Sequence, residues 1–247
     1  MADLVNILIL SLIGSVFALI GGVFFLFKKS WFEALSKYSI SFAAGVLVTV
    51  ALISLIPEAM DMSGEISLTF VLVSFFGAYL FEQFFCELHH HNDEARNISK
   101  ASIPLIIIGD TIHNFVDGVA ISASYIINPG LGFITALSTF LHEIPHEIGD
   151  FGILLRVGWD KRKIILVNLL SALATLVGAV FVYFYVSSDF VVGVFLSVSA
   201  GLFLYLGASD FLPRTHHKNV SKIKTVTALL LGVAIMIITT KLVLHTN

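Results

Sequence analysis

The sequence predicts an all-α membrane protein in which eight transmembrane helices form one domain over residues 1–247. Hydrophobic residues make up 57% of the chain and charged residues 13%, whereas soluble domains average about 25% charged residues. The mean hydropathy is +0.95, so the lipid bilayer must solvate most of the apolar surface. A spanning helix needs about 20 apolar residues, and eight such stretches follow one another: 4–27, 39–59, 66–88, 103–127, 131–155, 163–186, 190–211 and 223–244.

Each predicted span ends at a turn or charge signal. The first span follows Asp3 without a positively charged segment, which favours a retained helix over a cleaved signal peptide. The breaks are, in order, Lys28-Lys29-Ser30, Asp61-Met62-Ser63-Gly64, His89-His90-His91-Asn92-Asp93-Glu94, Asn128-Pro129-Gly130, Gly158-Trp159-Asp160-Lys161, Ser187-Ser188-Asp189 and Pro213-Arg214.

Positive charges alternate between these breaks. Of the 14 Lys and Arg residues, all except Lys241 lie in the loops after the first, third, fifth and seventh spans. Such residues concentrate on the cytoplasmic side of membranes, so we expect these loops inside and both termini outside. The net charge of −3, without a basic face, excludes a nucleic-acid partner, and the single Cys86 excludes an internal disulfide and a CxxC metal motif.

Ionisable side chains gather in the fourth and fifth spans, where hydrocarbon makes them costly. His113 and Asp117 are four residues apart and share one face of the fourth span. His142, His146 and Asp150 repeat every four residues and share one face of the fifth span. Two histidine-bearing faces on consecutive spans indicate a common site.

The short link Asn128-Pro129-Gly130 makes these two spans antiparallel neighbours. Asp117 lies 12 residues before Pro129 and His142 lies 13 residues after it. His113 lies 16 residues before Pro129 and His146 lies 17 residues after it. At 1.5 Å per residue, both clusters lie roughly 18–26 Å below the turn and therefore at one depth.

This set of side chains suits a borderline divalent metal ion. Imidazole favours Zn, Cu, Fe and Ni, and carboxylates broaden the tolerance toward Mn. We predict a Zn²⁺ site, with Fe²⁺, Mn²⁺ and Cd²⁺ as alternatives. The competing interpretation is a polar network that only locks the helices together.

At these residues the sequence resembles the ZIP (Zrt/Irt-like) family of metal transporters, in particular its LIV-1-type branch. The resemblance covers nearly the whole chain, and the motif in the fifth span is highly specific. The matching segments are His113-Asn114-Phe115-x-Asp117-Gly118, His142-Glu143-x-Pro145-His146-Glu147-x-Gly149-Asp150-Phe151, Leu55-Ile56-Pro57-Glu58-Ala59 and Ala200-Gly201-Leu202-Phe203-Leu204-Tyr205.

The resemblance implies a transporter, not an enzyme, that carries divalent metal toward the cytoplasm across the cell membrane. It implies a binuclear-like site, a homodimer, and movement of the fourth and fifth spans against the rest. Some family members add a glutamate from the sixth span, but Thr175 stands at the matching position here. The implied main metal ligands are His113, Asp117, His142 and His146, with Asn114 and Glu143 at the adjacent position.

His142-Glu143-Ile144-Pro145-His146 also reads as HExxH, the motif of zinc proteases, in which the glutamate acts as general base. Intramembrane proteases of this type take a third ligand from an aspartate far downstream. The downstream candidate, Asp210, lies at the cytoplasmic end of the seventh span, and Pro145 disturbs the helix that must aim both histidines. An intramembrane metalloprotease is the alternative function.

Further polar residues outline a path for the ion. Glu58 lies at the outer end of the second span, while Asp110 and Asp150 lie on the cytoplasmic side of the site, and Glu147 is four residues from Glu143. In the cytoplasmic loop after the third span, His89, His90 and His91 form a short tract that can bind zinc or remain a solvated loop.

Overall fold

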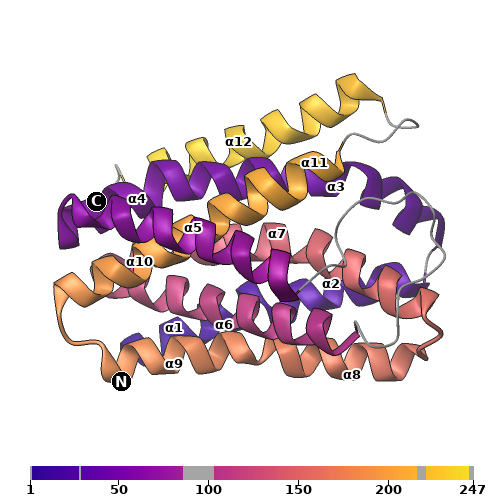
Figure 1. Ribbon diagram of the computed structural model, residues 1–247, viewed down its shortest axis with the longest axis horizontal. Coiled ribbons are helices and arrows are strands. Elements are labelled where there is room, and N and C mark those ends of the chain that lie inside the picture. Colours follow the sequence, from indigo (N-terminus) through magenta and orange to yellow (C-terminus); the bar gives the residue numbers. More distant parts are fainter. Residues whose placement is uncertain (1, 28, 86–102, 216–220, 245–247) are drawn as a thin grey trace.

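The computed structural model describes residues 2–27, 29–85, 103–215 and 221–244. Within these ranges every regular element is a helix, and the helices run side by side along the length of the molecule (Figure 1). The all-α prediction is confirmed. The elements are α1 (Ala2–Gly14), α2 (Val16–Phe27), α3 (Lys29–Val50), η1 (Ala51–Leu55), α4 (Ile56–Ser63), α5 (Ile66–Phe85), α6 (Ile103–Ile127), α7 (Pro129–Arg156), α8 (Lys161–Ala172), α9 (Ala174–Tyr185), α10 (Asp189–Leu204), η3 (Tyr205–Phe211), α11 (Leu212–Arg214) and α12 (Lys222–Leu244).

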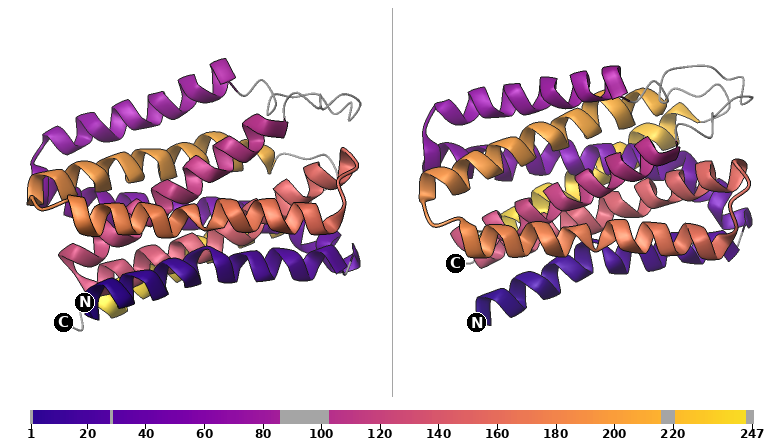
Figure 2. Two further views of the ribbon diagram at one scale, coloured as in Figure 1. Left: turned by 90° about the horizontal axis from the view of Figure 1, so that it is seen from below. Right: turned by 60° about the horizontal axis from the view of Figure 1, so that its bottom comes forward.

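The eight predicted spans appear as continuous or bent helical rods. Six segments of the described chain are long and apolar enough to cross a membrane: 2–21, 38–63, 66–84, 161–185, 189–211 and 222–244. The other two rods, α6 and α7, have 25 and 28 residues and carry the ionisable side chains. The start of α1 and the end of α12 lie at the end of the bundle that holds the α4–α5, α6–α7 and α9–α10 turns (Figures 1 and 2).

α3 differs from the predicted span because it begins at Lys29, ten residues before position 39. The added segment contains Glu33, Ala34, Leu35 and Lys37, which are strong helix formers. The helix therefore continues beyond the apolar stretch that hydropathy alone identifies.

Two rods contain π-helical turns, at Ala51–Leu55 and Tyr205–Phe211. Each turn precedes a proline, Pro57 or Pro213. Proline lacks the backbone N–H, and its ring clashes with the carbonyl four residues earlier. The backbone hydrogen bonds nearby therefore join residues five apart, as in a π-helix, in place of four apart.

Two further rods are interrupted beside one another. Next to Leu173, between α8 and α9, the carbonyl of Ala172 accepts a hydrogen bond of 3.2 Å from Ser15 Oγ, which lies between α1 and α2. A side chain that inserts into the backbone hydrogen bonds of a neighbouring helix is a recognised cause of such irregularities.

Glycines bring several helix pairs into backbone contact, as is common in membrane bundles. A Cβ atom at Gly118 of α6 would lie 1.9 Å from the Thr175 carbonyl oxygen of α9, and one at Gly178 would lie 2.1 Å from the Phe115 carbonyl oxygen. Gly45 and Gly232 join α3 to α12 in the same way. The α6–α9 contact fixes Thr175 beside the polar face of α6.

Gly118→Ala is therefore expected to lower the free energy of unfolding by about 1–3 kcal/mol, as overpacked cores do. Thermal unfolding of the detergent-solubilised protein measures this. Gly149→Ala is the matched control on α7, because a Cβ atom there meets nothing within 4 Å. Equal unfolding temperatures for the two variants would contradict the packing argument.

Candidate metal centre

The polar faces of α6 and α7 meet because a tight turn makes these helices antiparallel neighbours. Asn128 caps α7: its Oδ1 accepts hydrogen bonds from the Gly130 N–H at 2.7 Å and the Leu131 N–H at 3.3 Å. Pro129 occupies the first turn of α7, where its missing N–H costs nothing. α7 then continues as a helix through Pro145.

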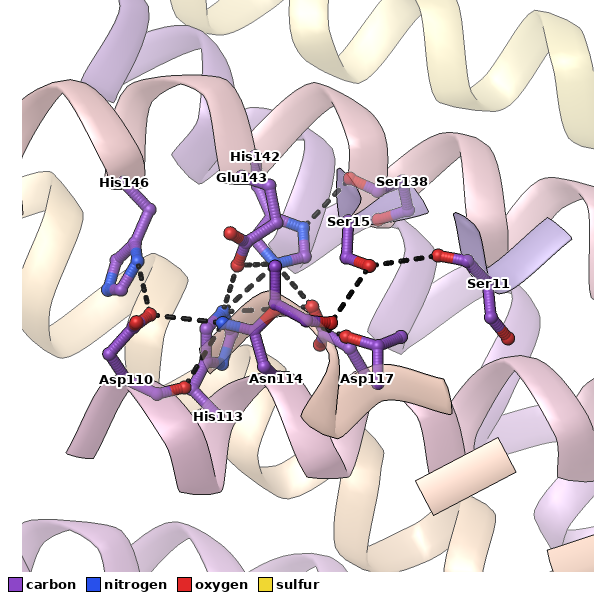
Figure 3. A network of polar contacts seen from close by, with 12 residues as sticks. Ser11, Ser15, Asp110, His113, Asn114, Asp117, Ser138, His142, Glu143 and His146 are labelled. Carbon is purple, nitrogen blue, oxygen red and sulfur yellow. Dashed lines mark hydrogen bonds and ion pairs between the residues drawn. The ribbon is translucent and has the colours of Figure 1, made fainter. Parts of the chain in front are cut away.

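Four side-chain atoms that can bind a metal ion converge between α6 and α7 (Figure 3). His113 Nε2 lies 3.2 Å from His142 Nε2, 3.0 Å from Glu143 Oε1 and 3.8 Å from Asp117 Oδ2. His142 Nε2 lies 3.3 Å from Asp117 Oδ2 and 3.9 Å from Glu143 Oε1. Tetrahedral zinc with bonds of about 2.0–2.1 Å separates its ligands by about 3.3 Å. The first cluster, as we call His113, Asp117, His142 and Glu143, thus has the spacing of a four-ligand zinc site.

The orientation of His142 prepares it to bind a metal. Its Nδ1 lies 2.8 Å from the Ser138 carbonyl oxygen, which can only accept a hydrogen bond. Nδ1 therefore carries a proton, and in the neutral tautomer of the ring the lone pair of Nε2 is directed into the cluster. Metal-binding histidines are commonly oriented by such a second hydrogen bond. No sequence pattern could predict this contact, because the acceptor is a backbone atom.

The first cluster is buried without enough hydrogen-bond donors. Asp117 and His142 have 0% exposure and Glu143 has 1%. Apart from their contacts with the two imidazoles, the carboxylate oxygens of Asp117 and Glu143 accept no hydrogen bond from any described residue. Two carboxylates in this setting are costly unless a cation joins them.

A second group lies beside the first and consists of Asp110, His146 and Asp150. Its ligand atoms lie within 4.8 Å of one another, and His146 Nδ1 is 3.5 Å from Asp110 Oδ1. The ring of His113 stands between the groups, with its centroid 5.2 Å from that of His142 and 5.0 Å from that of His146. The structure thus divides the predicted main ligands and places His146 with the predicted path residues.

Asn114 is held by hydrogen bonds beside the first cluster. Its amide nitrogen donates to the carbonyl oxygen of Asp110 at 3.2 Å and to Asp110 Oδ1 at 3.0 Å. Its Oδ1 accepts a hydrogen bond of 3.1 Å from the Thr175 hydroxyl. Asn114 therefore positions Asp110 and is tied to α9.

A cavity of about 440 Å³ adjoins the second group. Asp110, His113, His146 and Asp150 line it on the α6–α7 side, and Glu82, Tyr205 and Asp210 line it on the side of α5 and the α10 rod. The Tyr205 hydroxyl donates a hydrogen bond to Glu82 and so ties α5 to the π-helical turn. No sequence pattern predicts that Glu82 and Asp210 share a cavity with the α6–α7 residues, because the cavity depends on packing between distant segments.

The remaining predicted residues lie outside both groups. Glu147 is buried, with 1% exposure, and its carboxylate accepts no hydrogen bond from any described residue. Glu58 lies partly exposed on α4, near the end of the bundle that holds both termini. His89, His90 and His91 lie outside the described residues.

The chain was compared with known proteins. The family model described as "ZIP Zinc transporter" matches residues 88–240. Zinc transporter foi of Drosophila melanogaster is 37% identical over 137 residues, which are 54% of this chain and 19% of that protein. Zinc transporter ZIP10 of Danio rerio is 41% identical over 132 residues, or 51% and 15%. Human zinc transporter ZIP4 is 40% identical over 125 residues, or 49% and 19%.

The aligned part thus spans about a fifth or less of the length of these three relatives. The family model nevertheless covers more than half of the chain, including all of α6 and α7 with both polar groups. With its apolar rods, this chain is a multi-pass membrane protein that belongs to the ZIP zinc transporter family, in its LIV-1-type branch.

Proposed function

We propose that this chain carries Zn²⁺ across the membrane toward the cytoplasm, with the first cluster as its transport site. One observation carries the proposal: two imidazoles and two carboxylates converge at zinc-like spacing, buried and short of donors. Asn114, beside the first cluster, and His146, in the second group, are the neighbouring residues that we assign to the same transport site. Fe²⁺, Mn²⁺ and Cd²⁺ are the other ions that this ligand set accommodates.

The cavity supports release toward the end of the bundle where α5 ends and α6 begins. The charge pattern assigns this end to the cytoplasm, with both termini outside. Asp110, His113 and His146 border the cavity, whereas Asp117 and His142 on the other side are fully buried. In this arrangement the ion has a route inward while the outward side is closed. Glu58, near the outer end, is the proposed point of ion capture.

The protease alternative fits this geometry less well. A zinc protease needs both histidines of HExxH on one ion, with the glutamate free to activate water. Here His142 belongs to the first cluster, while His146 faces Asp110 in the second group. Glu143 Oε1 is 3.0 Å from His113 Nε2 and is thus part of the ligand set. The relatives named above are zinc transporters by name.

We further propose that the protein acts as a homodimer in the cell membrane. The family resemblance supports both expectations. Cross-linking of the protein in native membranes and fractionation of those membranes test them independently of transport.

Zinc uptake and peptide cleavage measured on one purified preparation in vesicles test the function. We expect uptake without cleavage, and uptake should decrease as the external pH falls from 7.5 to 5.5. Metal binding requires unprotonated imidazoles, and imidazole takes up protons near pH 6 to 7, so acid competes with the ion. Cleavage without uptake would establish the protease, and uptake that is constant across this range would contradict the proposed ligands.

A further inference from the structure

We propose that Asp110, His146 and Asp150 form a second cation-binding position, one helical turn from the first cluster on its cavity side. This inference rests on the proposed function and specifies where a second ion binds in this particular chain. It differs from a second position at Asn114 and Glu143 completed by the sixth span, which the family resemblance implies.

The geometry of the second group suits a divalent ion. His146 and Asp150 are four residues apart on α7, so both side chains lie on one face and meet Asp110 of α6. One imidazole and two carboxylates form a set of three protein ligands, which leaves a coordination position open on zinc. The adjoining cavity can supply water to that position.

Glu147 provides an independent indication of a cation. It is 1% exposed, and within the described chain its carboxylate finds no hydrogen-bond donor. It lies within Coulombic range of Asp110, Glu143 and Asp150. Among the described residues, no Lys or Arg lines the cavity that borders this group. Several carboxylates crowded in low dielectric must either take up protons or be offset by a positive charge, and a divalent ion between Asp110 and Asp150 provides that charge.

The hydrogen bonds of Asn114 argue against the position beside Thr175. The amide nitrogen, which cannot bind a cation, faces Asp110, and the amide oxygen already accepts from the Thr175 hydroxyl. Thr175 offers a neutral hydroxyl in place of a carboxylate. The close backbone contact at Gly118 packs α6 against α9 and so holds Thr175 next to Asn114. The second ion therefore has stronger ligands one turn closer to the cavity.

The two positions are connected through His113. Its ring lies about equally far from the rings of His142 and His146, at 5.2 and 5.0 Å. Ions in neighbouring sites repel one another, so arrival at the first cluster weakens the hold on the second ion. The second position is then an intermediate binding site from which the ion leaves toward Glu82 and Asp210.

The number of zinc ions bound per chain tests this proposal. The protein in detergent is dialysed to equilibrium against micromolar Zn²⁺, and zinc and protein are then quantified by elemental analysis. The six histidines outside the described residues, at positions 89, 90, 91, 216, 217 and 245, are replaced by serine in every sample because imidazole side chains in general bind zinc and would confound the count. We expect two ions for this background, one for Asp150→Asn, and two for Thr175→Val.

Asp189→Asn, an exposed aspartate at the start of α10, is the matched control and should retain two ions. Elution as a monodisperse species on size exclusion establishes that each variant is folded. The proposal is overturned if Asp150→Asn retains two ions, or if Thr175→Val retains one. A single ion in the background that disappears with Asp117→Asn would remove the second position and leave the proposed function intact. No bound ion in the background would remove both.

Discussion

Asp117→Asn is expected to reduce zinc flux and zinc affinity by at least about tenfold while it stabilises the metal-free protein. Asn keeps the shape of the side chain but removes the charge that holds the ion, and loss of groups that support a metal site costs 10–100-fold in affinity. The metal-free protein gains because a buried carboxylate without sufficient donors disappears. The Asn amide can donate to the neutral form of His142 at Nε2, which lies 3.3 Å from Asp117 Oδ2.

Zinc uptake into vesicles, zinc titration and thermal unfolding in chelator measure the three effects. Unfolding of the metal-free variant should require about 1–3 kcal/mol more free energy, the cost of an unsatisfied buried polar group. Asp189→Asn makes the same chemical change at an exposed position and should leave all three measurements unchanged. A general folding defect lowers stability together with flux, so a fall in both would contradict the assignment of Asp117 to the metal site.

Gly149→Leu is expected to abolish zinc flux while zinc affinity stays close to that of the unmodified protein. Gly149 lines the cavity beside Asp150, and a Cβ atom there meets nothing within 4 Å. A Cβ atom therefore fits without moving the backbone, and the rest of a leucine side chain extends into the space between the second group and the wall formed by α5 and the α10 rod. It adds no charge and removes no ligand.

Gly149→Ala provides a graded control, since one methyl group leaves most of the 440 Å³ cavity open and should preserve flux. Thr227→Leu places the same bulk on the exposed surface of α12 and should also preserve it. Flux is measured as uptake into vesicles and affinity by titration in detergent. If the Gly149→Leu variant transported zinc at the normal rate, the ion would leave by a route other than this cavity.

Local properties of the sequence were sufficient to predict the order of the membrane spans along the chain. The length of each apolar stretch and the turn signals between them predicted the order of the rods, and the structure agrees from α1 to α12. Hydropathy did not reveal that α3 begins at Lys29, because polar helix formers extend a helix without contributing apolar surface. The π-helical turns were also missed, although Pro57 and Pro213 mark the ends of both.

The histidines and carboxylates were also predictable as one constellation. A repeat of four residues on each helix and a short turn placed them on facing sides at one depth, and the structure brings them together. Helical periodicity cannot tell which side chains meet around one ion, however. That depends on how α6 is rotated against α7 and on side-chain rotamers, which the neighbouring helices restrict.

The sequence by itself determined that this is a multi-pass helical membrane protein with clustered histidines and carboxylates on its fourth and fifth spans. The length of the apolar stretches, the alternation of charge between loops and the repeat of four residues are properties of the sequence that do not depend on how the helices pack. Only the tertiary structure decided that His142 joins His113 and Asp117 while His146 turns to Asp110. It alone joined Asn114 to Thr175 and placed Glu82 and Asp210 across a cavity from the ligands. These relations depend on close packing between segments far apart in the sequence, as at Gly118 and Gly178, and no local pattern encodes that packing.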